Sequence, residues 1–104
     1  ILTGAGVSAA SGIPTFRGQD GFWKKRKTYG GCEEPERILT KDFFKEHAEA
    51  VWEWHYDFYE LQKKCKPNQG HHAILQFQEH CAQNGIECML VTQNIDDYHG
   101  LLIK

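Results

Sequence analysis

Residues 1–9 read Ile-Leu-Thr-Gly-Ala-Gly-Val-Ser-Ala, a short apolar run that leads directly into a glycine-rich turn. From Gly4 to Ala9 the turn fits the G-x-G-x-x-G/A fingerprint of dinucleotide-binding loops, which also follows a strand. In such a loop the first glycine permits a tight turn. The second lets backbone N–H groups approach a pyrophosphate, whose charge the next helix stabilises. Alone the signal is weak, because a glycine turn that only packs a helix on a sheet has the same pattern.

Two helices are predicted further along the chain. Residues 41–65 carry apolar side chains at spacings of three and four, with Thr40 as N-cap and Pro67 beyond the end. We expect its aromatic residues in the core more than on a binding surface. A second helix is predicted over residues 71–83, capped by Asn68, with its histidines as surface and packing residues. Its inner face is expected to hold Ala73, Ile74, Phe77 and Cys81.

A second strand completes the pattern. Gly85 provides a left-handed stop after the second helix, and residues 86–92 form a mostly apolar run typical of a buried parallel strand. The order is strand, glycine turn, long irregular excursion over residues 13–40, two helices and strand. This is a βαβ-like unit with an elaborate crossover, hence an α/β fold. Since two strands do not make a stable sheet, the other strands are expected from sequence outside these 104 residues.

Composition excludes several classes of function. A formal net charge of -2 gives no general attraction to nucleic acid or to an anionic membrane, and no apolar run approaches the length of a membrane helix. We therefore expect no direct nucleic-acid partner and no membrane partner. The four cysteines, which include no C-x-x-C pair, are best interpreted as reduced, mostly buried thiols of an intracellular protein. Nucleus, cytoplasm and mitochondrion are not distinguished.

A second polar cluster, Thr92-Gln93-Asn94-Ile95-Asp96, stands at the carboxyl end of the second predicted strand. Ligands of open α/β sheets bind outside the carboxyl ends of strands. The amide and carboxylate side chains suit ribose hydroxyls and an amide group. A turn capped by Asn and Asp side chains is the alternative, and for the cluster alone it is favoured.

Taken together, the two clusters closely resemble the sirtuin family. The segments that carry the resemblance are Gly4-Ala5-Gly6-Val7-Ser8, Ser11-Gly12-Ile13-Pro14, Phe16-Arg17-Gly18, Gly21-Phe22-Trp23, Pro67-Asn68-x-x-His71-x-Ala73-Ile74 and Thr92-Gln93-Asn94-Ile95-Asp96. The resemblance runs the whole length of the chain but covers less than half of a sirtuin catalytic core. It implies that residues 1–104 are a partial NAD-binding catalytic domain with an incomplete Rossmann-like parallel sheet. The family's zinc module would come later in the sequence.

The activity implied by the resemblance is NAD-dependent removal of an acyl group from a protein lysine, with histones among the candidate substrates. The acyl oxygen attacks the nicotinamide ribose, nicotinamide leaves, and the acyl group passes to ADP-ribose. Zinc is expected in the intact protein, although no cysteine of this chain matches a ligand position. The 104 residues alone are expected to show no turnover. A sirtuin-like ADP-ribosyltransferase and a truncated, non-catalytic NAD-binding or interaction protein remain as alternatives.

Site roles also follow from the resemblance. The implied cofactor-binding set is Gly4, Ala5, Gly6, Ser8, Ser11, Phe16, Arg17, Trp23, Gln93, Asn94, Ile95 and Asp96. The glycine loop with Ser8 would hold the phosphates, while Phe16 would cover the nicotinamide side and Arg17 would contact the cofactor. Of these residues, Asn94 and Asp96 would also be catalytic.

Roles for the second cluster are more specific. Gln93 and Asn94 would bind ribose, and Asp96 would hold the nicotinamide carboxamide. The family's general-base histidine is expected beyond this chain, because His99-Gly100 follows Asp96 too closely and matches a structural histidine of the motif. An alignment with an internal deletion would make His99 the base, which we disfavour.

Acyl preference is predicted from two positions of the long helix. Family members that remove negatively charged acyl groups carry a Tyr-x-x-Arg pair there, and this chain has His55 and Phe58 instead. A neutral acyl group such as acetyl is therefore expected.

Overall fold

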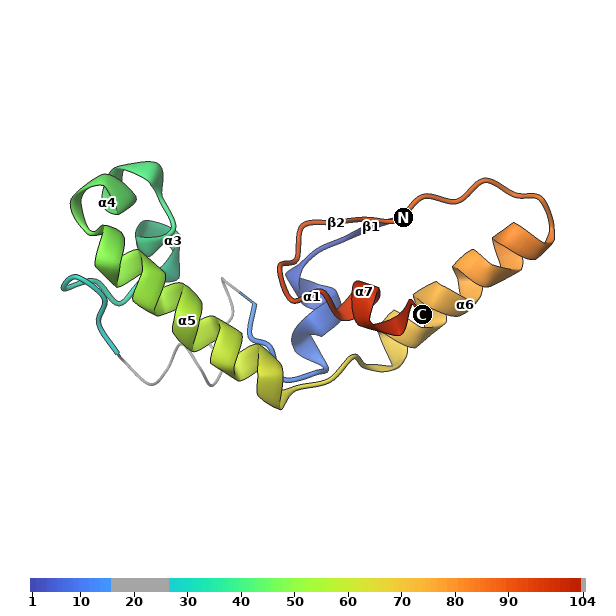
Figure 1. Ribbon diagram of the computed structural model, residues 1–104, viewed down its shortest axis with the longest axis horizontal. Coiled ribbons are helices and arrows are strands. Elements are labelled where there is room, and N and C mark those ends of the chain that lie inside the picture. Colours follow the sequence, from blue (N-terminus) through green and yellow to red (C-terminus); the bar gives the residue numbers. More distant parts are fainter. Residues whose placement is uncertain (16–26, 104) are drawn as a thin grey trace. The chain divides into compact units, whose positions relative to one another are not determined.

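The computed structural model describes residues 1–15 and 27–103, which form two compact units. One unit comprises Ile1–Ile13 and Cys65–Lys104, and the other comprises Pro14–Lys64. We call them the sheet unit and the helical unit and describe each by itself (Figure 1). None of the described helices combines the length and the apolar character needed to cross a membrane.

A parallel two-stranded sheet forms the edge of the sheet unit. Strand β1 (Leu2–Thr3) pairs with β2 (Val91–Thr92), with Leu2 opposite Val91 and Thr3 opposite Thr92. The parallel pairing is as predicted, but β2 is much shorter than the predicted strand over residues 86–92. It is also not buried, since Val91 is 50% exposed. In the described residues the sheet has only two strands, so no further layer covers β2.

The glycine turn leads straight into helix α1 (Ala5–Ala9). Its N-cap is Gly4, whose φ of -141° is extended backbone that any residue can adopt. Gly12 ends the helical segment with φ 98°, a conformation that glycine adopts without strain. The predicted early break of this helix is therefore confirmed at Gly12, whereas the turn at Gly4 needs no unusual backbone.

Helix α6 (Gln69–Gln83) begins two residues before the predicted start because Asn68 caps it as expected. The Asn68 side chain accepts a hydrogen bond from the Gly70 N–H at 2.8 Å, and the Asn68 N–H donates to His71 Nδ1 at 3.0 Å. Such reciprocal bonds satisfy N–H groups that the helix itself leaves unpaired. At the other end Gly85, with φ 68°, provides the predicted left-handed stop.

The core of the sheet unit is unusually polar. Its buried residues are Thr3, Ser8, Ile13, His71, Cys81, Tyr98 and His99. Tyr98 and His99 belong to helix α7 (Tyr98–Leu102), and the rings of both meet the His71 ring edge-on. The predicted inner face of α6 is confirmed for Cys81 but wrong for Phe77, which is 53% exposed.

The helical unit contains three described helices: α3 (Pro35–Ile38), α4 (Lys41–Glu46) and α5 (Ala48–Lys64). Thr40 caps α4 as predicted by accepting a hydrogen bond from the Phe43 N–H. The single helix predicted over residues 41–65 is divided at His47, whose φ of -136° is not helical. The periodicity of side chains continues across such a break, so it could not reveal it.

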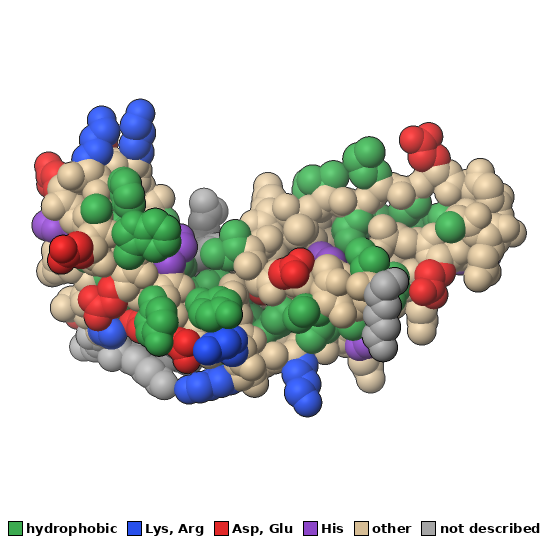
Figure 2. Space-filling model, viewed as in Figure 1, with side chains coloured by type: hydrophobic (Ala, Val, Ile, Leu, Met, Phe, Trp, Pro, Cys, Tyr) green, Lys and Arg blue, Asp and Glu red, His purple; other side chains and the backbone are tan. Residues whose placement is uncertain are grey.

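Aromatic residues of α5 divide between the core and the surface. Trp54 and Phe58 are buried and their rings stack with centroids 5.2 Å apart. Trp52, Tyr56 and Tyr59 are more than half exposed, so the prediction that the aromatic stripe forms core is only half right. Hydrophobic side chains are accordingly visible on the surface in Figure 2.

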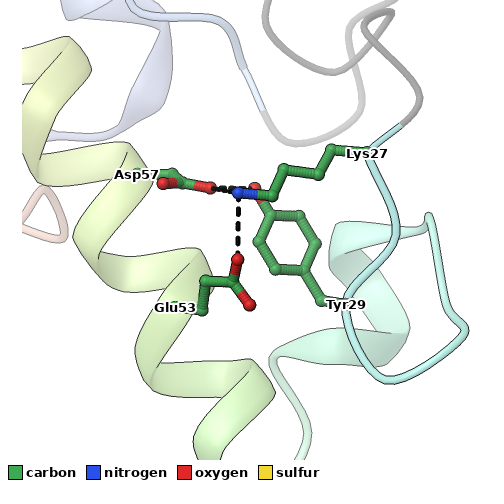
Figure 3. A network of polar contacts seen from close by, with 4 residues as sticks. All are labelled: Lys27, Tyr29, Glu53 and Asp57. Carbon is green, nitrogen blue, oxygen red and sulfur yellow. Dashed lines mark hydrogen bonds and ion pairs between the residues drawn. The ribbon is translucent and has the colours of Figure 1, made fainter.

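An ion-pair network joins residues 27–29 to α5 (Figure 3). Lys27 Nζ lies 2.7 Å from Asp57 Oδ2 and 3.0 Å from Glu53 Oε1, while the Tyr29 hydroxyl donates to Asp57 Oδ2 at 2.7 Å. Partial burial raises the pKa of Asp57, but the hydrogen bonds from Lys27 and Tyr29 outweigh it and lower the pKa overall. Burial, together with Asp57, raises the pKa of Tyr29.

Candidate functional site

Parallel pairing of β1 and β2 brings the two predicted clusters to one edge of the sheet. Gly4 follows β1 and Gln93 follows β2, and a Cβ placed on Gly4 would lie 3.6 Å from Gln93 Oε1. Asn94 Nδ2 donates to the Gly4 carbonyl at 2.9 Å. The glycine loop and the polar cluster therefore form one continuous site, although about 90 residues separate them.

Ser8 is the centre of this site. Its side chain is 1% exposed and its hydroxyl donates to Asp96 Oδ2 at 2.5 Å. His71 Nε2 lies 3.3 Å from the same oxygen, and Asn94 Nδ2 lies 3.5 Å from it. One hydroxyl on α1 thus contacts side chains from α6 and from the segment after β2.

The direction of the hydrogen bonds defines the protonation of His71. Nδ1 accepts from the Asn68 N–H, so in the neutral ring the proton is on Nε2. Nε2 then donates to Ser8, and Ser8 donates to Asp96. Burial lowers the pKa of His71 and the neighbouring His99 lowers it further, against an opposing effect of Asp96. His71 is therefore a neutral donor, and the Asp96 carboxylate is held at the end of a directed chain.

His71 is a site residue that the sequence interpretation missed. We expected it to be a surface or packing residue, yet it is 1% exposed and contacts Ser8. Its position three residues after the N-cap Asn68, where a capping box places its second side chain, was the available signal. Asn68 also donates through Nδ2 to the Val7 carbonyl at 2.7 Å and to Ser11 Oγ at 2.9 Å. The cap of α6 thereby positions α1 as well.

Asp96 combines both interpretations of the polar cluster. Oδ1 accepts from the Tyr98 N–H at 3.0 Å, which is the capped turn, while Oδ2 faces Ser8. Asp97, with φ 56°, adopts the left-handed conformation directly before α7. Ile95 between the polar residues is 62% exposed. The turn therefore presents an apolar side chain next to a fixed carboxylate.

A hollow of ≈ 380 Å³ lies beside this turn. The residues that line it include Leu90, Thr92, Asn94, Ile95, Asp96 and His99. Around Gly6 the space is also open, because a Cβ placed there would meet nothing within 4 Å. Both the polar cluster and the glycine loop can therefore be approached by a ligand.

Three members of the expected cofactor-binding set, Phe16, Arg17 and Trp23, lie outside the described residues. His99 is 9% exposed and its Nε2 lies 3.0 Å from Thr3 Oγ1, an arrangement that supports a structural role. In the described part of the chain, no group of three or more His, Cys, Asp or Glu side chains is arranged to hold a metal ion.

Comparison with family models identifies a Sir2 family match over residues 4–101. The chain is 41% identical over 99 residues to the mitochondrial NAD-dependent protein deacylase sirtuin-5 of Monodelphis domestica, covering 95% of this chain and 29% of the relative. It is 42% identical over 98 residues to an NAD-dependent protein deacylase of Aquifex aeolicus, covering 94% and 36%. This chain thus spans about a third of the curated relatives it matches.

Solved structures agree with the sequence relatives. A mutant Sir2 homologue in complex with ADP-ribose matches with a TM-score of 0.69 at 38% identity, covering 95% of this chain and 35% of that chain. A Sir2 mutant with a deacetylated p53 peptide and 3′-O-acetyl ADP-ribose matches with a TM-score of 0.70 at 34% identity, covering 96% and 36%.

Proposed function

Because the chain belongs to the Sir2 family, we propose that the protein that carries it is an NAD-dependent protein-lysine deacylase. Its relatives in Monodelphis domestica and Aquifex aeolicus are named as NAD-dependent protein deacylases. In this proposal residues 1–104 are the amino-terminal part of the NAD-binding catalytic domain. The reaction transfers the acyl group of a lysine to ADP-ribose and releases nicotinamide.

The observation that carries the proposal is the hydrogen bond between Ser8 and Asp96, supported by that between Asn94 and the Gly4 carbonyl. These two bonds connect a phosphate-binding type of loop to a polar cluster at the carboxyl edge of a parallel sheet. That edge is where open α/β sheets bind their ligands. The hollow of ≈ 380 Å³ beside the cluster is within the size range of small-molecule sites.

Each side chain then has a defined task. The backbone of Gly4, Ala5 and Gly6 with Ser8 would bind the phosphates. Asn94, whose Nδ2 is held by the Gly4 carbonyl, would turn Oδ1 to a ribose hydroxyl. Asp96 would accept hydrogen bonds from a carboxamide, because Ser8 and the Tyr98 N–H hold its two oxygens in place.

The remaining members of the proposed cofactor-binding set are Ser11, Phe16, Arg17, Trp23, Gln93 and Ile95. When bound, NAD would supply the electrophilic ribose carbon for the reaction. We propose that the general base and the zinc ligands come from the part of the relatives' length that this chain does not span.

A neutral acyl group is the proposed substrate. Phe58 is 5% exposed and stacks on Trp54, so it packs in the core and presents no charge. The His55 ring donates through Nδ1 to the Val51 carbonyl at 3.0 Å. Neither position offers the fixed cation that a negatively charged acyl group would require.

The test uses the natural full-length protein with NAD and an acetyl-lysine peptide. We expect nicotinamide and O-acetyl-ADP-ribose in equal amounts, and a large loss of both in the variants Asp96→Asn and Asn94→Ala. His72→Ala, an exposed change on α6, is the matched control and should keep full activity. Transfer of labelled ADP-ribose to protein without deacetylation would favour the ADP-ribosyltransferase alternative. ADP-ribose binding without any nicotinamide release would favour the non-catalytic one.

A further inference from the structure

Two cysteines of the sheet unit face each other across the turn that follows α6. Cys81 is in the last turn of the helix and is 2% exposed, while Cys88 is partly exposed. Their side chains are close enough for one thiol to hydrogen-bond the other. Both cysteines are reduced in the structure.

The backbone explains why the two thiols meet. The Ile86 N–H donates to the Cys81 carbonyl at 2.8 Å, and Gly85 takes the left-handed conformation that lets the chain reverse. Reversal at this point directs residues 86–88 back past the last turn of α6. Proximity of Cys81 and Cys88 is therefore a property of the helix stop, not of a chance side-chain rotamer.

The other two cysteines have different surroundings. The Cys32 thiol lies 3.8 Å from the Glu34 carbonyl, and the Cys65 thiol contacts the Tyr98 hydroxyl. Their contacts are with oxygen atoms, whereas Cys81 and Cys88 contact each other. Of the four cysteines, this pair is the one placed for a short-range disulfide.

We propose that Cys81 and Cys88 are a reversible oxidation site that forms an intramolecular disulfide on exposure to a hydroperoxide. The Cys88 thiolate attacks the peroxide, the O–O bond breaks, and hydrogen peroxide leaves one water and a Cys88 sulfenic acid. The Cys81 thiol then attacks the Cys88 sulfur, the S–O bond breaks, and a second water leaves. Two thiols are oxidised by two electrons in total and one peroxide is reduced to two waters. A dithiol reductant reverses the change.

The order of the two steps follows from burial. Burial and the neighbouring Cys88 raise the pKa of the Cys81 thiol, so Cys81 contributes little thiolate at neutral pH. Cys88 is the more accessible of the two and is the thiol that meets the oxidant first. The disulfide would connect the end of α6 to the segment that enters β2.

Peptide mapping of the natural full-length protein tests the proposal. After treatment with hydrogen peroxide, alkylation and cleavage after Glu79 and Glu87, Cys81 and Cys88 lie in separate peptides. We expect these two peptides to be joined under non-reducing conditions, with a mass about 2 Da below their sum, and to separate with dithiothreitol. The variant Cys32→Ser should give the same cross-link.

Cys88→Ser should abolish the cross-link and leave Cys81 open to alkylation only after unfolding. Because mapping of the unmodified sequence decides the question, a failure of that variant to fold does not weaken the test. Linkage of Cys81 to Cys65, linkage only between two molecules, or oxidation of Cys88 to a sulfinic acid with Cys81 still reduced would each overturn the proposal. The same holds for peptides that remain fully alkylated.

Discussion

The Ser8 hydroxyl and the Asp96 carboxylate are 2.5 Å apart although 88 residues separate them in the sequence. Ser8 lies on the helix after the glycine loop, and Asp96 lies on the turn after the second strand. A hydrogen bond to a charged acceptor is stronger than one between neutral groups. This single contact therefore connects the two halves of the candidate site, and it can be removed without a change in volume larger than one oxygen atom.

Ser8→Ala should weaken the binding of ADP-ribose by roughly tenfold, a difference of about 1.4 kcal/mol. The variant leaves Asp96 Oδ2 and His71 Nε2 without their common partner, so the carboxylate loses its fixed orientation. Calorimetric titration of the full-length protein with ADP-ribose measures the effect. Thr40→Ala, which removes the cap of α4 in the other unit, should lower stability but leave the affinity unchanged. Equal affinities for the Ser8 variant and the parent protein would contradict the proposed role.

Gly6→Ala should separate stability from binding. Nothing lies within 4 Å of the added Cβ, and Gly6 is inside α1, where alanine stabilises a helix by about 0.5–1 kcal/mol relative to glycine. We therefore expect unchanged or higher thermal stability together with weaker binding of ADP-ribose, because the methyl group occupies the approach to the backbone. Gly85→Ala is the contrasting variant, since its φ of 68° predicts loss of stability. Full binding by the Gly6 variant would show that no phosphate approaches this residue.

Acid should destabilise the fold through His71. Its folded-state pKa is lowered below the ordinary value of 6.5, so the unfolded chain binds a proton more readily than the folded one. The stability contributed by the neutral ring is complete above pH 6.5 and is lost as the pH falls through the folded-state value. Protonation also places a proton on Nδ1, which now accepts from the Asn68 N–H.

Urea denaturation at a series of pH values between 5 and 8 checks this behaviour. His71→Gln should remove most of the acid dependence, at a cost in stability at pH 8. His72→Gln, at an exposed position on the same helix, should keep it. The same slope for the parent protein and the His71 variant would assign the acid sensitivity to another group.

Asn68→Ala should cost more than an ordinary helix cap, roughly 1–3 kcal/mol of unfolding free energy. The side chain caps α6 through Oδ1 and at the same time donates to the Val7 carbonyl and to Ser11. Asn84→Ala, at the exposed C-terminal end of the same helix, should cost distinctly less because Asn84 contacts only residues of its own helix end. Denaturant unfolding of both variants measures the difference, and equal losses would refute the linking role of Asn68.

In the helical unit, Asp57 should matter more than its exposed partner Lys27. Asp57→Ala removes the acceptor of the Tyr29 hydroxyl, whose ring is 5% exposed, and should cost about 1–3 kcal/mol. Lys27→Ala removes only exposed ion pairs and should have little effect. Asp57→Asn keeps an acceptor for Tyr29 and should be intermediate. Thermal unfolding of the three variants tests this order, and a larger loss for the lysine variant would contradict it.

Local signals in the sequence predicted local structure well. Thr40 and Asn68 cap their helices as expected, and Gly12 and Gly85 take the left-handed conformations that end helical segments. Parallel pairing of the two strands also followed from the order of elements. Hydrophobic periodicity was less reliable. It missed the interruption at His47 and placed Trp52 and Phe77 in the core, although both are exposed.

By itself the amino-acid sequence determined the family, the helix caps and stops, and the residue types gathered after each strand. These features depend on neighbours within a few positions, so a pattern can show them. Only the tertiary structure decided that Ser8 contacts Asp96 and His71, and that Asn94 holds the Gly4 carbonyl. Contacts between residues 60 to 90 positions apart depend on strand register and on the path of the chain, and neither is encoded in local periodicity. His71 shows the difference most clearly, because its spacing from Asn68 is local while its burial and its proton position come from the packed fold.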